Sequence, residues 1–409
     1  MKVANFTCRS CGSVDIHSIL DLGTTPLANA LLKTPTPDDE ARYPLHLVFC
    51  ANCMLVQITE TVPPEELFSH YLYFSSFSDT MLAHAKTLVH RLVDERQLDS
   101  DSLTVEVASN DGYLLQYYKE QGVPVLGVDP AANIAEVAEQ KGIPTVVDFF
   151  GTQVAEKLVS EGKRASVIHA HNVLAHVANL NDVVAGMATL LADDGVVVVE
   201  APYVKDLIDH LEFDTIYHEH LCYFSLTALD KLFARHALTI THVERVAIHG
   251  GSLRIFAEHT DSAKRQASVT ALLAEEAGWG VHTLKFYSDF QERVEGLKAD
   301  LVAHLQSLKA EGHSIVAYGA SAKGSTLLNY FGISAETLDF VADRSTAKQG
   351  YYTPGTHLEI VPPEALVEKQ PDYTLLLVWN FAEEVLAQQQ VYRDAGGKFI
   401  IPLPKVTIV

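Results

Sequence analysis

The chain has 409 residues, of which 48% are hydrophobic and 20% charged, a composition typical of a folded protein with two or three domains. Its formal charge of −22 argues against a nucleic-acid partner, because phosphate affinity depends on clustered Lys and Arg. No signal-like run opens the chain and no apolar stretch could span a bilayer, so we expect a cytoplasmic protein with no membrane partner. In that compartment the five cysteines are expected to be thiols or metal ligands.

The N-terminal region holds four of these cysteines in two Cys-x-x-Cys pairs, Cys8 with Cys11 and Cys50 with Cys53. Two intervening residues let both sulfurs of a pair turn toward one ion, and two such pairs complete a tetrahedral thiolate site for zinc. A redox pair or unrelated buried thiols are the alternatives, and the doubled motif favours zinc. Four protein ligands leave no open coordination position, so the predicted metal is structural. Cys222 lies elsewhere and is not part of this site.

Between residues 103 and 259, short apolar strands alternate with segments of helix length. This alternation predicts an α/β fold with a doubly wound, mostly parallel sheet. The last two predicted strands are close together and are expected to form an antiparallel edge. The predicted strands are 104–108, 125–129, 145–148, 166–170, 196–200, 241–246 and 253–258.

The first of these strands leads into an acidic turn that is a candidate cofactor site. A small-residue turn at the carboxyl end of the first strand is where a doubly wound sheet receives a nucleotide-like ligand. A dinucleotide site would need Gly-x-Gly-x-x-Gly for the pyrophosphate, whereas this turn has one glycine and several acids, which favours a cationic cofactor such as S-adenosylmethionine. A plain α/β turn is the other alternative. The predicted cofactor-binding residues of the loop are Glu106, Ala108, Ser109, Asn110, Asp111 and Gly112.

Acids at the ends of the next two strands extend this candidate site. Asp129 follows the loop by about twenty residues, a spacing suited to a carboxylate that grips ribose hydroxyls. Asp148 ends the third strand, where its carboxylate is expected to meet adenine N6 while Phe149 covers the ring. Asn172, just after the fourth strand, is placed in the same set. Gly112 is expected to let the backbone approach the cofactor closely.

The segment Tyr217-His-Glu-His220 follows the fifth strand and its helix. It supplies phenol, carboxylate and imidazole groups, the set that general acid–base chemistry needs. We interpret Tyr217, Glu219 and His220 as candidate catalytic residues; chance clustering of histidines and a His-x-His metal pair are the alternatives. His176 is a second candidate, because the end of the fourth strand borders the transferred methyl in this architecture.

A long helix and a second α/β pattern complete the chain. Apolar residues recur every three or four positions from Phe286 to Leu308, which predicts a helix packed along one stripe. Two α/β units in one chain suggest a ligand held between them. The second unit is predicted to contain strands at 315–318, 338–342, 373–378 and 399–401, with helices at 324–330 and 382–390.

Together these segments resemble the sugar C-methyltransferases of deoxysugar biosynthesis, which act on nucleotide-linked 4-keto-6-deoxyhexoses, commonly dTDP sugars. Tyr217-His-Glu-His220 and Gly319-Ala-Ser-Ala-Lys-Gly324 are specific to that family, and the cofactor loop alone is not. Ala108 departs from the pattern, since relatives often have glycine there, and its methyl group is expected to crowd the carboxypropyl arm of the cofactor. The resemblance covers nearly the whole chain and includes the two cysteine pairs and segments 20–23, 26–29, 71–76 and 109–112.

The resemblance implies an S-adenosylmethionine-dependent enzyme, monomeric, in three parts. These are a zinc-binding domain at 1–68, a class I methyltransferase domain at 69–262, and a helical linker with a Rossmann-like α/β domain at 263–409 that binds the nucleotide sugar. His220 would be the base that removes the proton alpha to the keto group, with C-3 favoured. Tyr217 and Glu219 would position the sugar or stabilise the enolate, with His176 nearby.

The resemblance also implies residues that bind the substrate. Tyr71 or Tyr73 would close over the cofactor or the sugar. The glycine-rich turn of the last domain looks like a cradle for the pyrophosphate, although a tight strand–helix connection would have the same pattern. Its predicted binding residues are Tyr318, Gly319, Ser321, Lys323 and Gly324.

Two other functions remain compatible with these patterns. The first is methylation of oxygen or nitrogen in another small molecule, which would rely more on proximity than on a base. The second is a non-catalytic, zinc-containing assembly protein, and the intact run of acids in the cofactor loop argues against it.

Overall fold

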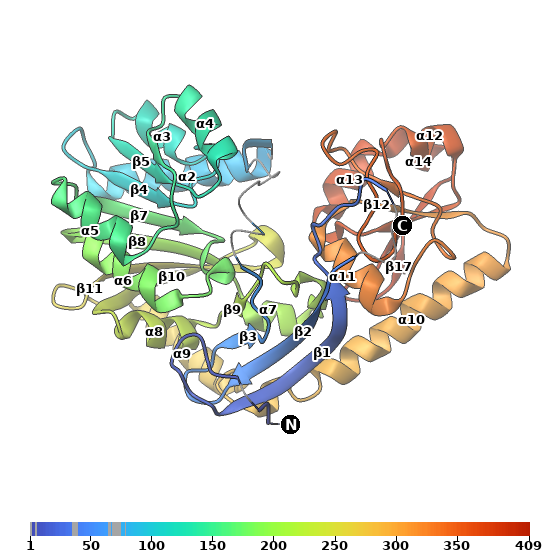
Figure 1. Ribbon diagram of the computed structural model, residues 1–409, viewed down its shortest axis with the longest axis horizontal. Helices are drawn as coiled ribbons and strands as arrows, with labels where there is room; N and C mark the ends of the chain where they lie inside the picture. The colour runs from blue at the N-terminus through green and yellow to red at the C-terminus, as the bar shows by residue number, and fades with distance from the viewer. Residues whose placement is uncertain (1, 5, 35–39, 64–66, 68–74, 78) are drawn as a thin grey trace.

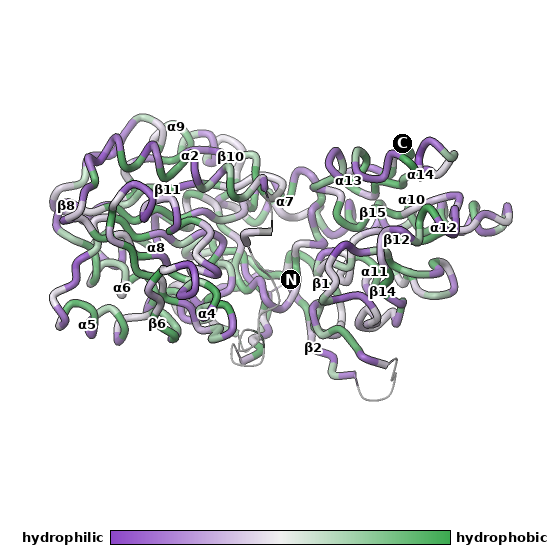
Figure 2. Tube along the Cα trace, turned by 90° about the horizontal axis from the view of Figure 1, so that it is seen from above, coloured by the Kyte–Doolittle hydropathy of each residue, from purple (hydrophilic) through white to green (hydrophobic). Residues whose placement is uncertain are grey.

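Three β-sheets organise the chain in the computed structural model, which describes all residues except 1, 5, 35–39, 64–66, 68–74 and 78. In Figure 1 the green α/β unit and the orange-red C-terminal α/β unit lie on either side of the N-terminal strands. Seen from above, the chain forms two lobes joined by a narrower waist (Figure 2). None of the helices built from the described residues has the length and apolarity needed to cross a membrane.

The central sheet has seven strands in the order β10-β11-β8-β7-β4-β5-β6. Six strands are parallel, and β11 runs antiparallel between β8 and β10. All seven predicted strands and the antiparallel edge are therefore confirmed. Their bounds are β4 Thr104–Val107, β5 Val125–Val128, β6 Thr145–Val146, β7 Ala165–His171, β8 Leu191–Pro202, β10 Leu238–Val246 and β11 Ser252–His259.

Helices cover both faces of this sheet, as buried apolar strands require. One face carries α2 (Asp79–Arg96), α3 (Leu115–Glu120) and α4 (Ala132–Gln140), which share one cluster of buried side chains. The other carries α5, α6 and α8, with α9 against α8 and β10. These helices span Thr152–Ser160, Leu180–Leu190, Leu226–Ala234 and Ala267–Trp279, and the short α7 spans Val204–Asp209.

The N-terminal sheet consists of β1 (Ile16–Pro26), β2 (Arg42–Cys50), β3 (Val56–Ile58) and the distant β9 (Cys222–Tyr223). β9 comes from the region of the central sheet and begins two residues after the Tyr217–His220 segment. Because β1 also contacts α10 and α11, this sheet touches both α/β units.

The long helix α10 (Phe290–Ala310) leads to the C-terminal unit, and the predicted stripe is buried along it from Phe290 to Leu308, while Phe286 lies in the preceding turn. The C-terminal sheet has the order β14-β13-β12-β15-β16-β17, parallel except for β17. The predicted helix at 382–390 is two helices, and β14, β17 and α12 were not predicted. The bounds are β12 Ile315–Tyr318, α11 Ala322–Phe331, β13 Val341–Ala342, β14 Ile360–Val361, α12 Ala365–Lys369, β15 Tyr373–Leu376, α13 Ala382–Gln388, α14 Gln390–Asp394, β16 Lys398–Ile401 and β17 Thr407–Ile408.

Candidate active site

The two Cys-x-x-Cys pairs fold into matching turns. Gly12 donates its amide to the carbonyl of Cys8 at 2.9 Å, and Met54 donates its amide to the carbonyl of Cys50 at 2.9 Å. Gly12 and Met54 also share a left-handed backbone, with φ of 70° and 64°. This repeated local geometry turns both sulfurs of each pair inward.

The four sulfurs form one cluster in which all Sγ atoms lie within 4.8 Å of one another. The Sγ atoms of Cys8 and Cys53 are 3.5 Å apart, and those of Cys11 and Cys50 are 3.6 Å apart. A tetrahedral zinc site with Zn–S bonds of about 2.3 Å separates its sulfurs by about 3.8 Å, so the cluster fits zinc. Gln57 donates Nε2 to Cys8 Sγ at 3.2 Å, as amides around thiolate metal sites do.

The acidic loop after β4 has a strained backbone. Ala108, Asn110 and Gly112 have φ of 51°, 50° and 77°, in the left-handed region. Gly112 was predicted to let the backbone approach a cofactor, but a Cβ there would lie 2.3 Å from Ile143 Cδ1. Its glycine is therefore required by its φ and by packing on Ile143.

Asp129, at the end of β5, fixes the shape of this loop. One carboxylate oxygen accepts the amide of Asn110 and the other the amide of Ala131, both at 2.9 Å. Burial raises the pKa of Asp129, and these two backbone donors oppose that rise. Asp129 thus lies beside the loop, where a ribose-binding carboxylate was predicted.

Buried polar atoms without protein partners test whether this site fits a cofactor. Glu106 Oε2, Ser109 Oγ, Asp111 Oδ1 and Asn172 Oδ1 are buried and have no hydrogen-bond partner among the described residues. Such atoms are costly unless a ligand or water completes them. Burial raises the pKa of Glu106 well above its usual range, and the nearby carboxylates Asp129 and Asp111 add to the rise. A cationic ligand with hydrogen-bonding groups, such as S-adenosylmethionine, would satisfy these atoms.

The remaining predicted cofactor residues lie at the same edge of the sheet. Asp148 is exposed and accepts the amide of Phe149 at 2.8 Å, and the Phe149 side chain is 42% exposed, as a ring that covers a base would be. Asn172 follows β7 with φ of 57°. Tyr71 and Tyr73 lie outside the described residues.

His220, Tyr217 and His176 come together. Tyr217 Oη and His220 Nε2 are 2.8 Å apart, and the rings of His176 and His220 meet edge to face at 4.8 Å between centroids. His220 Nδ1 lies 2.9 Å from the carbonyl oxygen of Thr215, which only accepts. Nδ1 must therefore carry a proton, so Nε2 is the nitrogen that would accept a proton if His220 acts as a base.

His176 is held in the same way. Its Nδ1 donates to the carbonyl oxygen of Glu219 at 2.7 Å. Burial lowers the pKa of His176 to about 4, so its ring is neutral at pH 7. Only three residues separate Asn172 from His176, so the backbone of His176 lies within about 14 Å of Asn172 at the proposed cofactor site.

Glu219 faces a junction between all three parts of the chain. Asn29 Nδ2 donates to Glu219 Oε1 at 2.6 Å, and burial raises the pKa of Glu219 to about 7 while Asn29 and Lys348 lower it. Lys348 also donates Nζ to the carbonyl of Ala320 at 2.8 Å. Sequence reasoning assigned no role to Asn29 or Lys348, because their partners lie 190 and 28 residues away.

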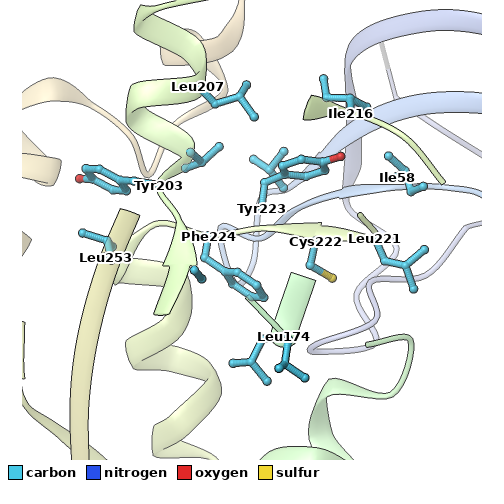
Figure 3. Packing of buried hydrophobic residues seen from close by; sticks show 14 of the residues in the cluster. Ile58, Leu174, Tyr203, Leu207, Ile216, Leu221, Cys222, Tyr223, Phe224 and Leu253 are labelled. Carbon is cyan, nitrogen blue, oxygen red and sulfur yellow. The ribbon is translucent and has the colours of Figure 1, made fainter. Parts of the chain in front are cut away.

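The residues that follow His220 anchor the segment in the core. Leu221, Cys222 and Phe224 are almost fully buried, and Figure 3 shows them among Ile58 of β3 and Leu174. Because the segment is packed on both sides, its histidines have little freedom to move.

The glycine-rich turn of the C-terminal unit is held by an aspartate in the same way as the cofactor loop. Asp343, after β13, accepts the amides of Ala320 and Ser345, each at 2.7 Å, just as Asp129 accepts two amides after β5. Ser321 caps α11 by accepting the amide of Gly324 at 3.1 Å. Gly319 has φ of 97°, and a Cβ there would lie 2.6 Å from Val378 Cγ1.

Two predicted substrate residues of this turn have buried side-chain ends. The Tyr318 side chain is 3% exposed and packs on Phe399 inside the C-terminal core. The Lys323 ammonium is buried 4.7 Å from the Trp379 ring centroid, without a hydrogen-bond partner in the described part of the chain. Trp379 donates Nε1 to Asp214 at 2.7 Å. Lys323 thus lies between the two α/β units, where its charge acts on Asp214, and its predicted contact with the pyrophosphate stays a prediction.

Comparison with known proteins covers the whole chain in three parts. Family profiles match a zinc binding domain at residues 8–68, a methyltransferase domain at 79–243 and a C-methyltransferase C-terminal domain at 247–404. The C-methyltransferase NovU of Streptomyces niveus is 36% identical over 407 residues, which is 98% of this chain and 96% of NovU.

Solved methyltransferase structures match less than half of the chain. Magnesium protoporphyrin IX methyltransferase of Synechocystis PCC 6803, with bound SAM, is 14% identical with a TM-score of 0.33, covering 43% of this chain and 78% of that one. The CcbJ methyltransferase of Streptomyces caelestis is 13% identical with a TM-score of 0.34, covering 43% and 89%.

The strand order with one antiparallel strand, the acidic loop after its first strand and the matching profile define a class I methyltransferase with S-adenosylmethionine as its cofactor. With the four-cysteine zinc-binding domain and the full-length match, the chain belongs to the C-methyltransferase family.

Proposed function

We propose that this C-methyltransferase methylates the carbon next to the ketone of a nucleotide-linked 4-keto-deoxysugar, C-3 being favoured. The observation that carries the proposal is the Tyr217–His220 pair, in which Nε2 of the imidazole lies 2.8 Å from the phenol oxygen while Nδ1 faces the carbonyl oxygen of Thr215. Carbon becomes a nucleophile only after deprotonation, so C-methylation needs a base. His220 is the base in this proposal.

The cofactor would lie across the carboxyl ends of β4, β5 and β7. Glu106, Ser109, Asp111 and Asn172 supply the buried atoms that would contact it, and Asp129 would bind the ribose. When bound, S-adenosylmethionine supplies a methyl group on a positively charged sulfur. The acidic lining of the loop favours that charge by simple attraction.

Proton removal would then depend on the two histidines and the phenol. Thr215 accepts the Nδ1 proton of His220, and in the proposal the proton from carbon passes to Nε2, which faces Tyr217 Oη, as the enolate forms. Tyr217, hydrogen-bonded to the same nitrogen, can turn its hydroxyl toward the enolate oxygen. His176 stays neutral at pH 7, so its ring adds no positive charge beside His220.

The sugar would bind where the three parts of the chain meet. We assign zinc-dependent positioning to residues 1–68, cofactor binding and proton removal to 69–262, and nucleotide binding to 263–409. Glu219 with Asn29 would contact sugar hydroxyls. Ser321, Gly324 and the helix amides at the start of α11 would face the phosphates, with Lys323 and Lys348 as the candidate cations.

Mass spectrometry with a labelled methyl donor and a panel of 4-keto nucleotide sugars tests the proposal. We expect one sugar to gain a single methyl group bonded to carbon. A product methylated on oxygen or nitrogen would support the alternative methyltransferase. If S-adenosylmethionine binds but no keto sugar in the panel gains a methyl group, the assigned substrate class is wrong.

A further inference from the structure

The catalytic segment is hydrogen-bonded to the metal-binding unit through its own backbone. β9, which begins two residues after His220, pairs antiparallel with β3, with Gln57 opposite Cys222 and Val56 opposite Tyr223. Ile58 also donates its amide to the carbonyl of Leu221 at 3.0 Å. The last strand of the metal-binding sheet is thus a continuation of the segment that carries His220.

The side chain of Gln57 joins this strand pair to the metal ligands. It is fully buried, its Oε1 accepts the amide of Arg9 at 3.1 Å, and its Nε2 donates to Cys8 Sγ at 3.2 Å. The Arg9 amide can only donate, so the orientation of the Gln57 amide is fixed and Nε2 must face the sulfur. Four thiolates around zinc carry a formal charge of −2, which N–H donors to sulfur offset.

Arg9, between the two cysteines of the first pair, reinforces the same link. Its guanidinium donates to the carbonyls of Ile58 and Glu60, so it follows β3 beyond Gln57. Gln57 of β3 therefore contacts the first metal-binding turn, and Arg9 of that turn contacts β3. The register of β3 consequently depends on the shape of the turn.

On the other side, the position of β9 determines where the imidazoles lie. Leu221 donates its amide to the carbonyl of Ala175 at 2.7 Å, and His176 donates Nδ1 to the carbonyl of Glu219. The His176 turn is thus tied to the backbone at Glu219 and Leu221, on either side of His220 and just before β9. A shift of a fraction of an ångström there would change their geometry toward a substrate, and small misplacements of catalytic groups can cost about 100-fold in rate.

We propose that Gln57 is a positioning residue, which couples the zinc site to the catalytic histidines through the β3–β9 pair. In this proposal zinc binding fixes the shape of the first cysteine turn, and Gln57 makes the position of β3 depend on that turn. Because β9 pairs with β3, the positions of His220 and His176 depend on it in turn. The inference rests on the proposed function for the catalytic role of His220.

Two variants of the full-length, zinc-loaded protein test the coupling. Gln57→Leu removes both hydrogen bonds, and Gln57→Glu keeps the acceptor for the Arg9 amide but loses the donor to Cys8. We expect zinc release to a chromogenic chelator to accelerate about 10–100-fold in both variants, and kcat to fall by a similar factor. The affinity for S-adenosylmethionine, measured by calorimetry, should stay within about twofold, because the cofactor loop follows β4 of the central sheet whereas β3 belongs to the N-terminal sheet. This binding also reports that the variants are folded.

The pH profile of kcat separates positioning from a general loss of stability, since a displaced His220 should also shift the pH at which the rate rises. Gln389→Leu, which removes a buried amide from the C-terminal unit, is the matched control and should leave zinc release unchanged. Faster zinc release with unchanged kcat and pH profile would overturn the coupling, and unchanged zinc release would overturn the role of Gln57. Full activity of His220→Gln would instead overturn the proposed function.

Discussion

Replacing Ala108 by glycine relieves the strain in the cofactor loop. Ala108 has φ of 51°, a conformation that costs an L-amino acid about 1–2 kcal/mol and costs glycine almost nothing. Glycine loses more chain entropy on folding, which offsets about 0.5–1 kcal/mol of this gain. The expected net stabilisation of the cofactor-free protein is about 0.5–1 kcal/mol, which corresponds to a rise in Tm of about 1–4 °C for a unit of this size.

Scanning calorimetry without and with S-adenosylmethionine is the assay. The transition that moves when the cofactor is added identifies the methyltransferase unit, so that the other units do not obscure the shift. Ala247→Gly is the matched control, because Ala247 is exposed and has φ of −79°. This control should lower Tm. If Ala108→Gly lowers Tm as much as the control does, the left-handed strain assigned to this loop is wrong.

Three further predictions concern charge and metal. Burial raises the pKa of Glu106 in the cofactor-free protein, so binding of a cation should release a proton and the affinity for the cofactor should increase with pH. Calorimetry in two buffers of different ionisation enthalpy measures the proton release. A Glu106→Gln variant that releases as many protons as wild type would contradict the prediction. Lys323→Met should destabilise the protein by about 1–3 kcal/mol, and by more at pH 8 than at pH 5.5. Burial raises the pKa of Asp214 to about 6, so the carboxylate that loses the Lys323 charge is ionised at pH 8 and mostly protonated at pH 5.5. Melts that shift equally at both pH values, or a large rise in substrate KM, would show that Lys323 does not act through Asp214. Removal of zinc by a chelator should abolish turnover but leave S-adenosylmethionine binding unchanged, and added zinc should restore turnover. Undiminished turnover after complete removal would exclude a role for the metal.

Local patterns were enough to predict the strands and the metal ligands. Alternation of apolar runs with helix-length segments located all seven strands of the central sheet, because each parallel strand is buried and bounded by turn residues. The spacing within Cys8–Cys11 and Cys50–Cys53 identified the cluster, since a turn of that length can place both sulfurs on one ion.

Contacts between distant residues could not be predicted in this way. β9 is two residues long and pairs with β3 more than 160 positions earlier, so no periodicity marks it. The buried position of the Lys323 ammonium depends on Trp379 and Asp214, which lie on other elements. The left-handed φ of Ala108 likewise depends on its tertiary contacts. The glycine that relatives often have at this position was the one indication of it in the sequence.

The most direct test of the account is solvent deuterium exchange into the substrate identified by mass spectrometry, without a methyl donor. We expect wild-type protein to exchange the hydrogen on the carbon next to the ketone, and His220→Gln to exchange it at least about 100-fold more slowly while it binds S-adenosylmethionine normally. Equal exchange by both proteins would contradict His220 as the base.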